Sequence, residues 1–309
     1  MRSVWRALAD AGVASGASGF GARLTAVFDS LGQLAVGIDP HAWLLEQWGL
    51  PDTAHGAREF GLRVVDAAAG RVGIVKPQVA FFERFGSAGF AALESVLAAA
   101  RAAGLLVIAD AKRGDLGTSI EAYGQAWLTP GSPLEADAMT ISAYQGVRSL
   151  EAPLALALAG GKGLFLLAAT SNPEARDLQT AILSSGARAG RSVAASIVDD
   201  VVEINAKHDS GKPGSIGLVP GSIGLVLGAT VDFGSYGIDL AAIAARPSTP
   251  VLAPGFGHQG ARYDQLEKLY GPAAPFAVVS ASRSILQAGR NGIAEAIRAQ
   301  AGEVFECRA

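Results

Sequence analysis

The 309-residue sequence has one cysteine, Cys307, and only four histidines. A single cysteine cannot form a disulfide within the chain, and it has no cysteine partners for a zinc site. The histidines are scattered, without the spacing of metal ligands. We therefore expect no resident metal ion, and the low cysteine content fits the reducing environment of the cytoplasm.

Long apolar runs and charge of one sign are also scarce. No run approaches the roughly 18 residues that a membrane-spanning helix needs, and Asp10 interrupts the short apolar stretch near the N-terminus, which argues against a signal peptide. The net charge is −3, so no general field attracts nucleic acid or an anionic membrane. We expect a soluble cytoplasmic protein that binds neither.

The sequence does contain a regular series of short apolar runs, each bounded by Gly, Pro or a polar residue. Continuous apolarity without alternation is typical of strands covered on both faces of a parallel sheet. The predicted strands are residues 34–39, 72–76, 105–110, 137–141, 163–170, 223–230, 250–255 and 276–282. Helical spacing predicts helices at 59–70, 88–104, 118–128, 174–185, 190–207, 235–245, 261–270 and 289–301.

Most intervals between these strands have the length of one βα unit, which is about thirty residues. Eight such units predict an α/β protein, a (β/α)₈ TIM barrel, as a single domain over residues 1–309. An open doubly wound sheet is the alternative, but it usually has fewer strands. We expect residues 1–33 to form a helical extension that caps the bottom of the barrel.

One interval is unusually long because the segment GSIGLV occurs twice, at 214–219 and 221–226. The seven-residue spacing is too short for a structural repeat, and a tandem duplication is the simplest interpretation. We expect the second copy to form the sixth strand because it continues directly into Gly-Ala-Thr. Residues 208–222 are then an inserted, duplicated loop at the bottom of the barrel.

Polar residues stand where the predicted strands end, which is where the active sites of such barrels lie. One group follows strands seven and eight and consists of Gly255, Gly257, Gln259, Ser282 and Arg283. Glycines let backbone N–H groups approach phosphate oxygens, and an arginine binds phosphate through two parallel hydrogen bonds. An ordinary turn would also explain the glycines, but together with the arginine they favour a phosphate site.

The second group is acidic and basic, and follows strands one to three: Asp39, Lys76, Asp110, Lys112 and Asp115. Individually these are ordinary loop residues; Asp115 could cap a helix, and Lys76 could extend into solvent. Converging on one barrel mouth, the carboxylates and ammonium groups would keep one another ionised. An ammonium held there can donate a proton to a developing carbanion.

With these residues in place, the sequence resembles orotidine 5′-phosphate decarboxylases, and specifically their longer bacterial group with a D-A-K-R-G-D motif. The resemblance covers nearly the whole chain. The matching segments are VGIDPH (36–41), VKPQVAFFERFG (75–86), DAKRGDLG (110–117), TSNPE (170–174), GAT (228–230), APGFGHQG (253–260) and SASRSIL (280–286). Of these, the D-x-K pair alone is less specific, because related sugar-phosphate barrels share it.

The resemblance implies a role for each matching residue. Lys112 is implied as the proton donor to C6 of the pyrimidine, and Asp110 as the carboxylate facing the substrate carboxylate. Asp115 is implied to enter the site of the neighbouring subunit in a homodimer. The implied substrate contacts are Lys76 and Asp39 to the ribose, Ser171 to the base, Gln259 to base and phosphate, and Arg283 to the phosphate. The family uses no metal or cofactor.

The sequence departs from the family pattern at two points. The family usually has D-I-G-S-T after the lysine, whereas this chain has DLGTS. The position of a ribose-contacting threonine is therefore Ser119, which keeps a hydroxyl group but lacks the methyl. The doubled GSIGLV is the second departure, and it lies on the side of the barrel away from the expected chemistry.

The resemblance implies decarboxylation of orotidine 5′-phosphate to uridine 5′-phosphate, driven by electrostatics. Three alternatives remain open at this point. A Mg²⁺-dependent sugar-phosphate decarboxylase or lyase would use Asp39 and Asp110 as metal ligands. A Schiff-base aldolase would use Lys76 or Lys112, and a non-catalytic nucleotide-binding protein would have lost its chemistry through the duplication.

Overall fold

The computed structural model describes residues 19–208 and 220–307. Within them, eight parallel strands pair in chain order and close into a barrel, β1 pairing with β8. The strands are β1 Leu34–Ile38, β2 Ile74–Pro77, β3 Leu106–Arg113, β4 Ala138–Ser142, β5 Gly163–Ala169, β6 Ile223–Leu227, β7 Val251–Pro254 and β8 Ala277–Ala281. This confirms the predicted TIM barrel and the approximate position of every strand.

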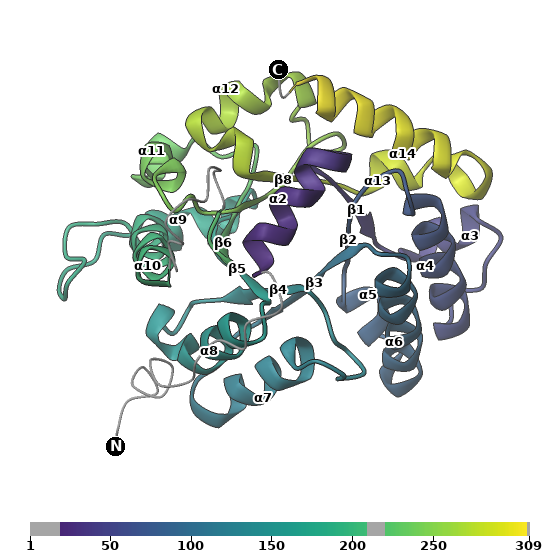
Figure 1. Cartoon of the computed structure of the whole chain (residues 1–309), viewed down its shortest axis with the longest axis horizontal. Coiled ribbons are helices and arrows are strands. Elements are labelled where there is room, and N and C mark those ends of the chain that lie inside the picture. Colours follow the sequence, from purple (N-terminus) through teal and green to yellow (C-terminus); the bar gives the residue numbers. More distant parts are fainter. Residues whose placement is uncertain (1–18, 209–219, 308–309) are drawn as a thin grey trace.

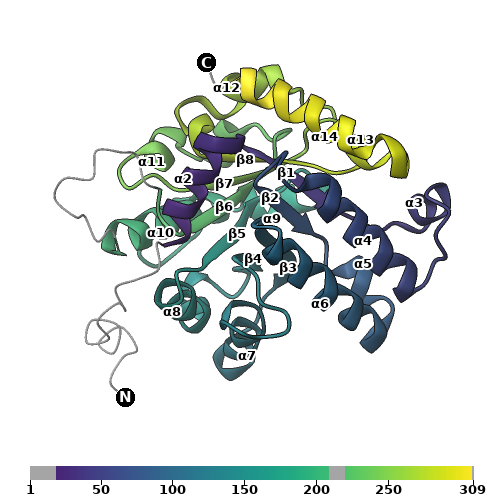
Figure 2. The same cartoon turned by 45° about the vertical axis from the view of Figure 1, so that its right-hand side comes forward.

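Helices surround the barrel on its outside (Figures 1 and 2). In chain order they are α3 Ala42–Gln47, α4 Ala54–Ala68, α5 Ala80–Glu83, α6 Gly86–Ala102, α7 Gly117–Leu128, α8 Glu151–Ala159, α9 Arg176–Thr180, α10 Val193–His208, α11 Leu240–Ala244, α12 Leu266–Tyr270, α13 Arg283–Leu286 and α14 Gly289–Glu306. The apolar side chains between these helices and the outer face of the sheet form the larger of two hydrophobic cores.

The helix α2, Phe20–Leu31, closes the bottom of the barrel, where we expected the N-terminal extension; residues 1–18 of that predicted extension lie outside the described residues. It lies across the ring of strands in Figure 1. Its buried Phe20, Leu24 and Phe28 pack with the inward-facing side chains of the strands and complete the inner core. The ring of Phe20 meets that of Phe165 edge-on, at 5.9 Å between centroids. A Cβ at Gly163 would lie 2.5 Å from the Phe20 ring, so the glycine at the start of β5 makes room for this helix.

An ion pair also holds α2 on the barrel. The guanidinium of Arg23 binds the buried Asp137 carboxylate, which in turn accepts the backbone N–H of Val107 at 2.8 Å. Arg23 also donates to the carbonyl of Gly161 at 2.9 Å. The helix is therefore fixed to three strand starts, which leaves the opposite end of the barrel for a binding site.

The strand β6 coincides with the second copy of GSIGLV, as predicted. The side chain of Asn205 in α10 exchanges hydrogen bonds with the backbone of Ile223, at 2.7 and 3.2 Å. The backbone N–H of Gly221 donates to the carbonyl of Ser248 at 2.8 Å. The first copy, at 214–219, lies outside the described residues. These contacts fix the start of the strand and thereby its register.

Three of the predicted helices need correction. The helix expected over 174–185 ends at Thr180, because the chain then folds back and Ile182 forms an isolated bridge with Ser192. Gly186 and Gly190 have φ of 85° and 84°, which do not continue an α-helix. The helices expected over 235–245 and 261–270 contain only the short α11 and α12, each preceded by a 3₁₀ turn.

The helix α8 was not predicted, because its sequence EAPLALALA is apolar on almost every side and shows no helical period.

Candidate active site

A cavity of about 310 Å³ opens at the C-terminal ends of the strands. Most of the residues predicted for the site line it: Asp39, Lys76, Asp110, Lys112, Ser171, Gly255, Gln259, Ser282 and Arg283. They come from β2, β3 and the segments that follow β1, β5, β7 and β8. The barrel thus brings together side chains that are as much as 244 positions apart in the sequence, Asp39 and Arg283.

The Asp110 carboxylate is the centre of a charged cluster in this cavity. Its Oδ2 lies 2.8 Å from Nζ of Lys76, and its Oδ1 lies 2.5 Å from Nζ of Lys112. Asp110 and Lys76 are almost fully buried, whereas the Lys112 side chain is 46% exposed and reaches into the opening. The cluster therefore holds one anion between two cations, with one of the cations facing the space where a ligand would lie.

Burial and charge act in opposite directions on this cluster. Burial raises the pKa of Asp110, but the two neighbouring ammonium groups outweigh it, so the pKa lies well below its usual range. Burial likewise lowers the pKa of Lys76, but the carboxylates of Asp110 and Asp39 outweigh it and leave the pKa raised. Both groups are therefore ionised at neutral pH.

Two further side chains bind Asp110, and the sequence analysis gave neither a role. The amide of Gln78 donates to Oδ2 at 3.0 Å, and the hydroxyl of Thr140 donates to Oδ1 at 2.9 Å. The two-residue period of a strand would have indicated both residues, because Gln78 shares a face with Lys76, and Thr140 shares one with Ala138, which faces the barrel interior. With four donors around it, the carboxylate is held in a single orientation.

The opposite wall of the cavity has the composition of an anion site. Gly255 and Gly257 have φ of 113° and 71°, values that suit glycine and expose the backbone of this loop. The hydroxyl of Ser171 donates to Oε1 of Gln259 at 3.2 Å, which joins the segment after β5 to the segment after β7. Arg283 is the first residue of α13. These groups form a polar wall facing the lysine–aspartate cluster.

Asp39 connects the two walls of the cavity. Its Oδ2 accepts a hydrogen bond from the hydroxyl of Ser282. Its Oδ1 is buried and has no hydrogen-bond partner among the described residues. A buried carboxylate oxygen without a donor is costly unless a ligand supplies one. Asp39 is therefore suited to accept a hydroxyl group of a ligand.

Asp115 and Ser119 do not line the cavity of their own chain. Asp115 accepts the backbone N–H of Leu116 at 2.8 Å, and Ser119 is exposed in the first turn of α7. Large side chains are exposed in the same region: Leu116 is 59%, Tyr123 37% and Tyr144 76% accessible. Two predicted site residues thus lie on a partly apolar outer surface beside the barrel mouth.

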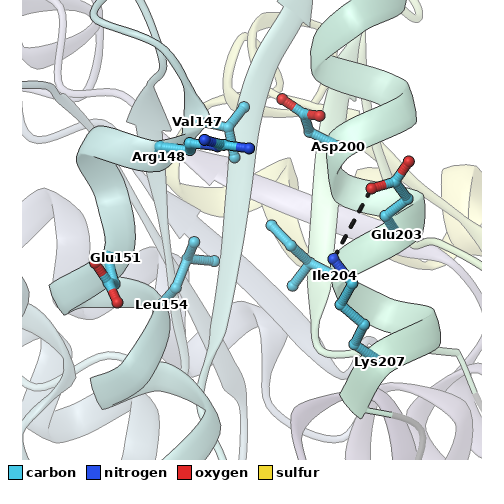
Figure 3. Close-up of a pocket in the computed structure, with 8 residues that line it drawn as sticks. All are labelled: Val147, Arg148, Glu151, Leu154, Asp200, Glu203, Ile204 and Lys207. Atoms are coloured by element: carbon cyan, nitrogen blue, oxygen red, sulfur yellow. Dashed lines mark ion pairs between the residues drawn. The ribbon is translucent and has the colours of Figure 1, made fainter. Parts of the chain in front are cut away.

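A second hollow, of about 520 Å³, lies between α8 and α10 on the side of the barrel (Figure 3). Carboxylates of α10 dominate one wall; Arg188 binds Asp200 and Glu203, and Glu203 also lies 3.9 Å from Nζ of Lys207. Leu154 of α8 and Ile204 of α10 form the apolar part of its lining. Because Asp200 and Glu203 are paired with basic side chains on the helix surface, this hollow lacks the convergent charged groups of the barrel mouth.

No cluster of three or more His, Cys, Asp or Glu side chains has an arrangement suited to a metal ion within residues 19–208 and 220–307. In the same residues, every helix is too short or too polar to cross a bilayer.

Comparison with known proteins identifies close relatives. Residues 32–299 match the model of the orotidine 5′-phosphate decarboxylase / HUMPS family. The orotidine 5′-phosphate decarboxylase of Salinispora arenicola is 46% identical over 292 residues, which are 94% of this chain and 97% of that protein. The enzyme of the same name from Corynebacterium glutamicum strain R is 44% identical over 87% of this chain and 91% of its own length.

Solved structures give the same result. A crystal structure from Streptomyces avermitilis superposes with a TM-score of 0.85 at 42% identity, covering 94% of this chain and 96% of that chain. The Leishmania donovani OMP decarboxylase superposes with a TM-score of 0.71 at 28% identity, over 94% and 99% of the two chains. This chain therefore shares the barrel fold of these relatives.

Proposed function

The chain belongs to the orotidine 5′-phosphate decarboxylase family and decarboxylates orotidine 5′-phosphate in pyrimidine nucleotide biosynthesis, and from this premise we propose that Lys112 and Asp110 perform the chemical step. The observation that carries the proposal is the contact of 2.5 Å between Nζ of Lys112 and Oδ1 of Asp110 at the cavity wall. It places a half-exposed ammonium beside a carboxylate that stays ionised.

The reaction breaks the bond between C6 and the carboxylate carbon, and the electron pair of that bond stays on C6. Carbon dioxide leaves, Lys112 gives its proton to C6, and the resulting amine recovers a proton from solvent. A fixed ammonium stabilises the negative charge on C6 as it develops, which is stronger binding of the transition state than of the substrate. Asp110 would lie beside the substrate carboxylate and favour its departure.

The remaining residues of the cavity are proposed to bind the rest of the nucleotide. Arg283 and the backbone around Gly255 would bind the phosphate, because the guanidinium and exposed N–H groups match its oxygens. Gln259 and Ser171, already hydrogen-bonded to each other, would contact the phosphate and the base. Because the phosphate is remote from C6, its binding energy is available to close these segments over the site.

The ribose is proposed to lie between the two walls. Asp39 has a buried carboxylate oxygen without a donor, which a ribose hydroxyl would supply, and Ser282 holds the other oxygen in place. Lys76 would donate a further hydrogen bond while it stays paired with Asp110. With the ribose bound in this way, the carboxylates of Asp39 and Asp110 would each have hydrogen-bond donors for both oxygens.

We further propose a homodimer in which each chain completes the site of the other. Asp115 and Ser119 lie outside the cavity of their own chain, beside the exposed Leu116, Tyr123 and Tyr144. An apolar surface of this kind is suited to a two-fold interface, where the same patch serves both subunits. Asp115 would then reach the charged cluster of the neighbouring chain, and Ser119 its ribose site.

Mixing two inactive variants tests this shared site. Lys112→Ala and Asp115→Ala should each be inactive alone, whereas a mixed dimer has one site with both native residues. At equal amounts and random exchange, about a quarter of the wild-type sites are restored, so about a quarter of the activity is expected. The activity is measured after reversible dissociation and mixing, with subunit exchange verified by two affinity tags. Exchange without recovered activity would contradict the shared site.

We propose that the reaction needs no metal ion or cofactor and occurs in the cytoplasm. The support is electrostatic, since Lys76 and Lys112 already balance the charge of Asp110 and occupy the oxygens that Mg²⁺ would bind. The rate of loss of orotidine 5′-phosphate absorbance should be unchanged after dialysis against EDTA, with the chelator kept in the assay. Loss of activity that Mg²⁺ restores would favour the metal-dependent alternative.

A further inference from the structure

The backbone at Lys112 is unusual for a residue with a side chain. Its φ is 47°, the only positive φ of a non-glycine residue among those described. This left-handed conformation costs L-residues about 1 kcal/mol or more and persists only where neighbouring groups hold it. With the backbone in this left-handed conformation, the side chain of Lys112 turns back toward Asp110, two residues earlier in the strand.

The sheet itself does not hold this conformation. The pairing of β3 with β4 is regular at Ala109 and Met139, and then shifts register before it resumes at Arg113 and Ile141. The irregular stretch contains both Asp110 and Lys112. The backbone N–H of Lys112 donates instead to the hydroxyl oxygen of Thr140, at 2.9 Å.

The same hydroxyl binds the catalytic carboxylate. Thr140 donates its hydroxyl hydrogen to Oδ1 of Asp110 at 2.9 Å, and this is the oxygen that Nζ of Lys112 contacts. The side chain is 1% exposed, so water has little access to replace it. One hydroxyl group thus links the main chain of Lys112 to the side chain of Asp110, using its acceptor and its donor at once.

We propose that Thr140 is a positioning residue for the decarboxylation: its hydroxyl holds the left-handed turn at Lys112 and thereby aims the ammonium at C6. The inference rests on the proposed role of Lys112. A β-branched residue suits the task, because branching restricts the rotation of the side chain and fixes the direction of the hydroxyl. The effect falls on the reacting end of the substrate, since the contacts of Thr140 run to Asp110 and Lys112 and not to Arg283 or Gln259.

The test compares Thr140→Val, which keeps the shape and removes the hydroxyl, with Thr140→Ser, which keeps the hydroxyl. Because small misplacement of a catalytic group is costly, kcat should fall about 100-fold in Thr140→Val. The KM and the Kd for uridine 5′-phosphate should stay near wild type, because the phosphate and base contacts are unchanged. Thr140→Ser should recover most of kcat. If Thr140→Val does not fold, Thr140→Ala gives the same comparison with a smaller side chain.

Thr249→Val is the matched control. Thr249 is also fully buried, and its hydroxyl accepts a hydrogen bond from Asn205 at 3.1 Å, at the bottom of the barrel. Both valine variants should lower the melting temperature in circular dichroism, but only Thr140→Val should lose kcat. The inference is overturned if Thr140→Val keeps its kcat, or if Thr249→Val loses as much kcat as Thr140→Val does. It is also overturned if the affinity of Thr140→Val for uridine 5′-phosphate falls as much as its kcat, or if Thr140→Ser does not recover kcat.

Lys112→Ala separates this inference from the proposed function on which it rests. If Lys112→Ala is inactive and Thr140→Val is active, Lys112 keeps its role and only the positioning by Thr140 fails. If Lys112→Ala itself retains turnover, the role of Lys112 fails, and Thr140 has no catalytic group to position.

Discussion

Lys112→Ala is expected to lower kcat for orotidine 5′-phosphate by at least about 10⁴-fold, since it removes both the proton donor and the charge that stabilises the carbanion. Among the described residues that line the cavity, the one other ammonium is that of Lys76, which is buried and already paired with Asp110. The rate is followed by the loss of substrate absorbance at enzyme concentrations high enough to detect slow turnover.

The fold of this variant should remain intact. The side chain of Lys112 is half-exposed, and Asp110 keeps its contacts with Lys76, Gln78 and Thr140. Because the Lys112 end of this ion pair is half-exposed and Asp110 keeps its other donors, the melting temperature should change only slightly. Binding of uridine 5′-phosphate should persist, because the phosphate wall is untouched. Inactivity with retained binding separates a catalytic role from a structural one.

Lys162→Ala is the matched control for this variant. Lys162 is buried, and its Nζ lies 2.6 Å from Oε1 of Glu135 at the bottom of the barrel. Removing one partner of a buried ion pair should destabilise the protein more than Lys112→Ala does, yet leave kcat unchanged. Near-wild-type kcat in Lys112→Ala, or an equal loss in Lys162→Ala, would be incompatible with the proposed mechanism.

The strands and the mouth residues could be predicted because each is a local feature of the sequence. A run such as LLVIAD shows both a strand covered on two faces and, at Asp110, the point where it ends. Parallel pairing in chain order then brings all such ends to one rim. The position of Asp110 between Lys76 and Lys112 follows from this topology, although the individual contacts do not.

What could not be predicted depends on neighbours that are distant in sequence. The strand period places Gln78 and Thr140 on the inward face, but their hydrogen bonds to Asp110 depend on how three strands lie side by side. The register shift between β3 and β4 at Asp110 and Lys112 has no local pattern that encodes it. The uniform apolarity of α8 hides its helical period. The placement of Asp115 and Ser119 on the outer surface is explained by the proposed homodimer, in which they would reach the site of the neighbouring chain.

The two identical copies of the doubled segment differ in the residue that follows each of them, and this residue explains which copy forms the strand. Both copies read GSIGLV, but Leu227 follows the second and Pro220 follows the first. Leu227 ends β6 paired with Ala169, and its carbonyl accepts the hydroxyl of Tyr270 at 2.7 Å. A proline at that position has no N–H for the ladder. The residue after the repeat therefore favours the second copy as the strand.

Arg283→Ala is expected to weaken binding of uridine 5′-phosphate by roughly 100- to 1,000-fold, because it removes charge-assisted hydrogen bonds to the phosphate. The loss in kcat/KM should be at least as large, since phosphate binding energy is also used to close the site over the substrate. Calorimetric titration gives the Kd for uridine 5′-phosphate and for uridine in both proteins. If Arg283 acts on the phosphate, the variant should bind the two ligands with nearly equal affinity.

The control for this variant is Arg262→Ala, which removes an arginine from the same loop region. Arg262 is 73% exposed, pairs with Asp264, and does not line the barrel mouth, so its loss should leave both affinities unchanged. Unaltered binding of uridine 5′-phosphate in Arg283→Ala would place the phosphate elsewhere in the cavity. A parallel loss of uridine binding would show that Arg283 supports the whole site, because a phosphate contact alone cannot affect a ligand that has no phosphate.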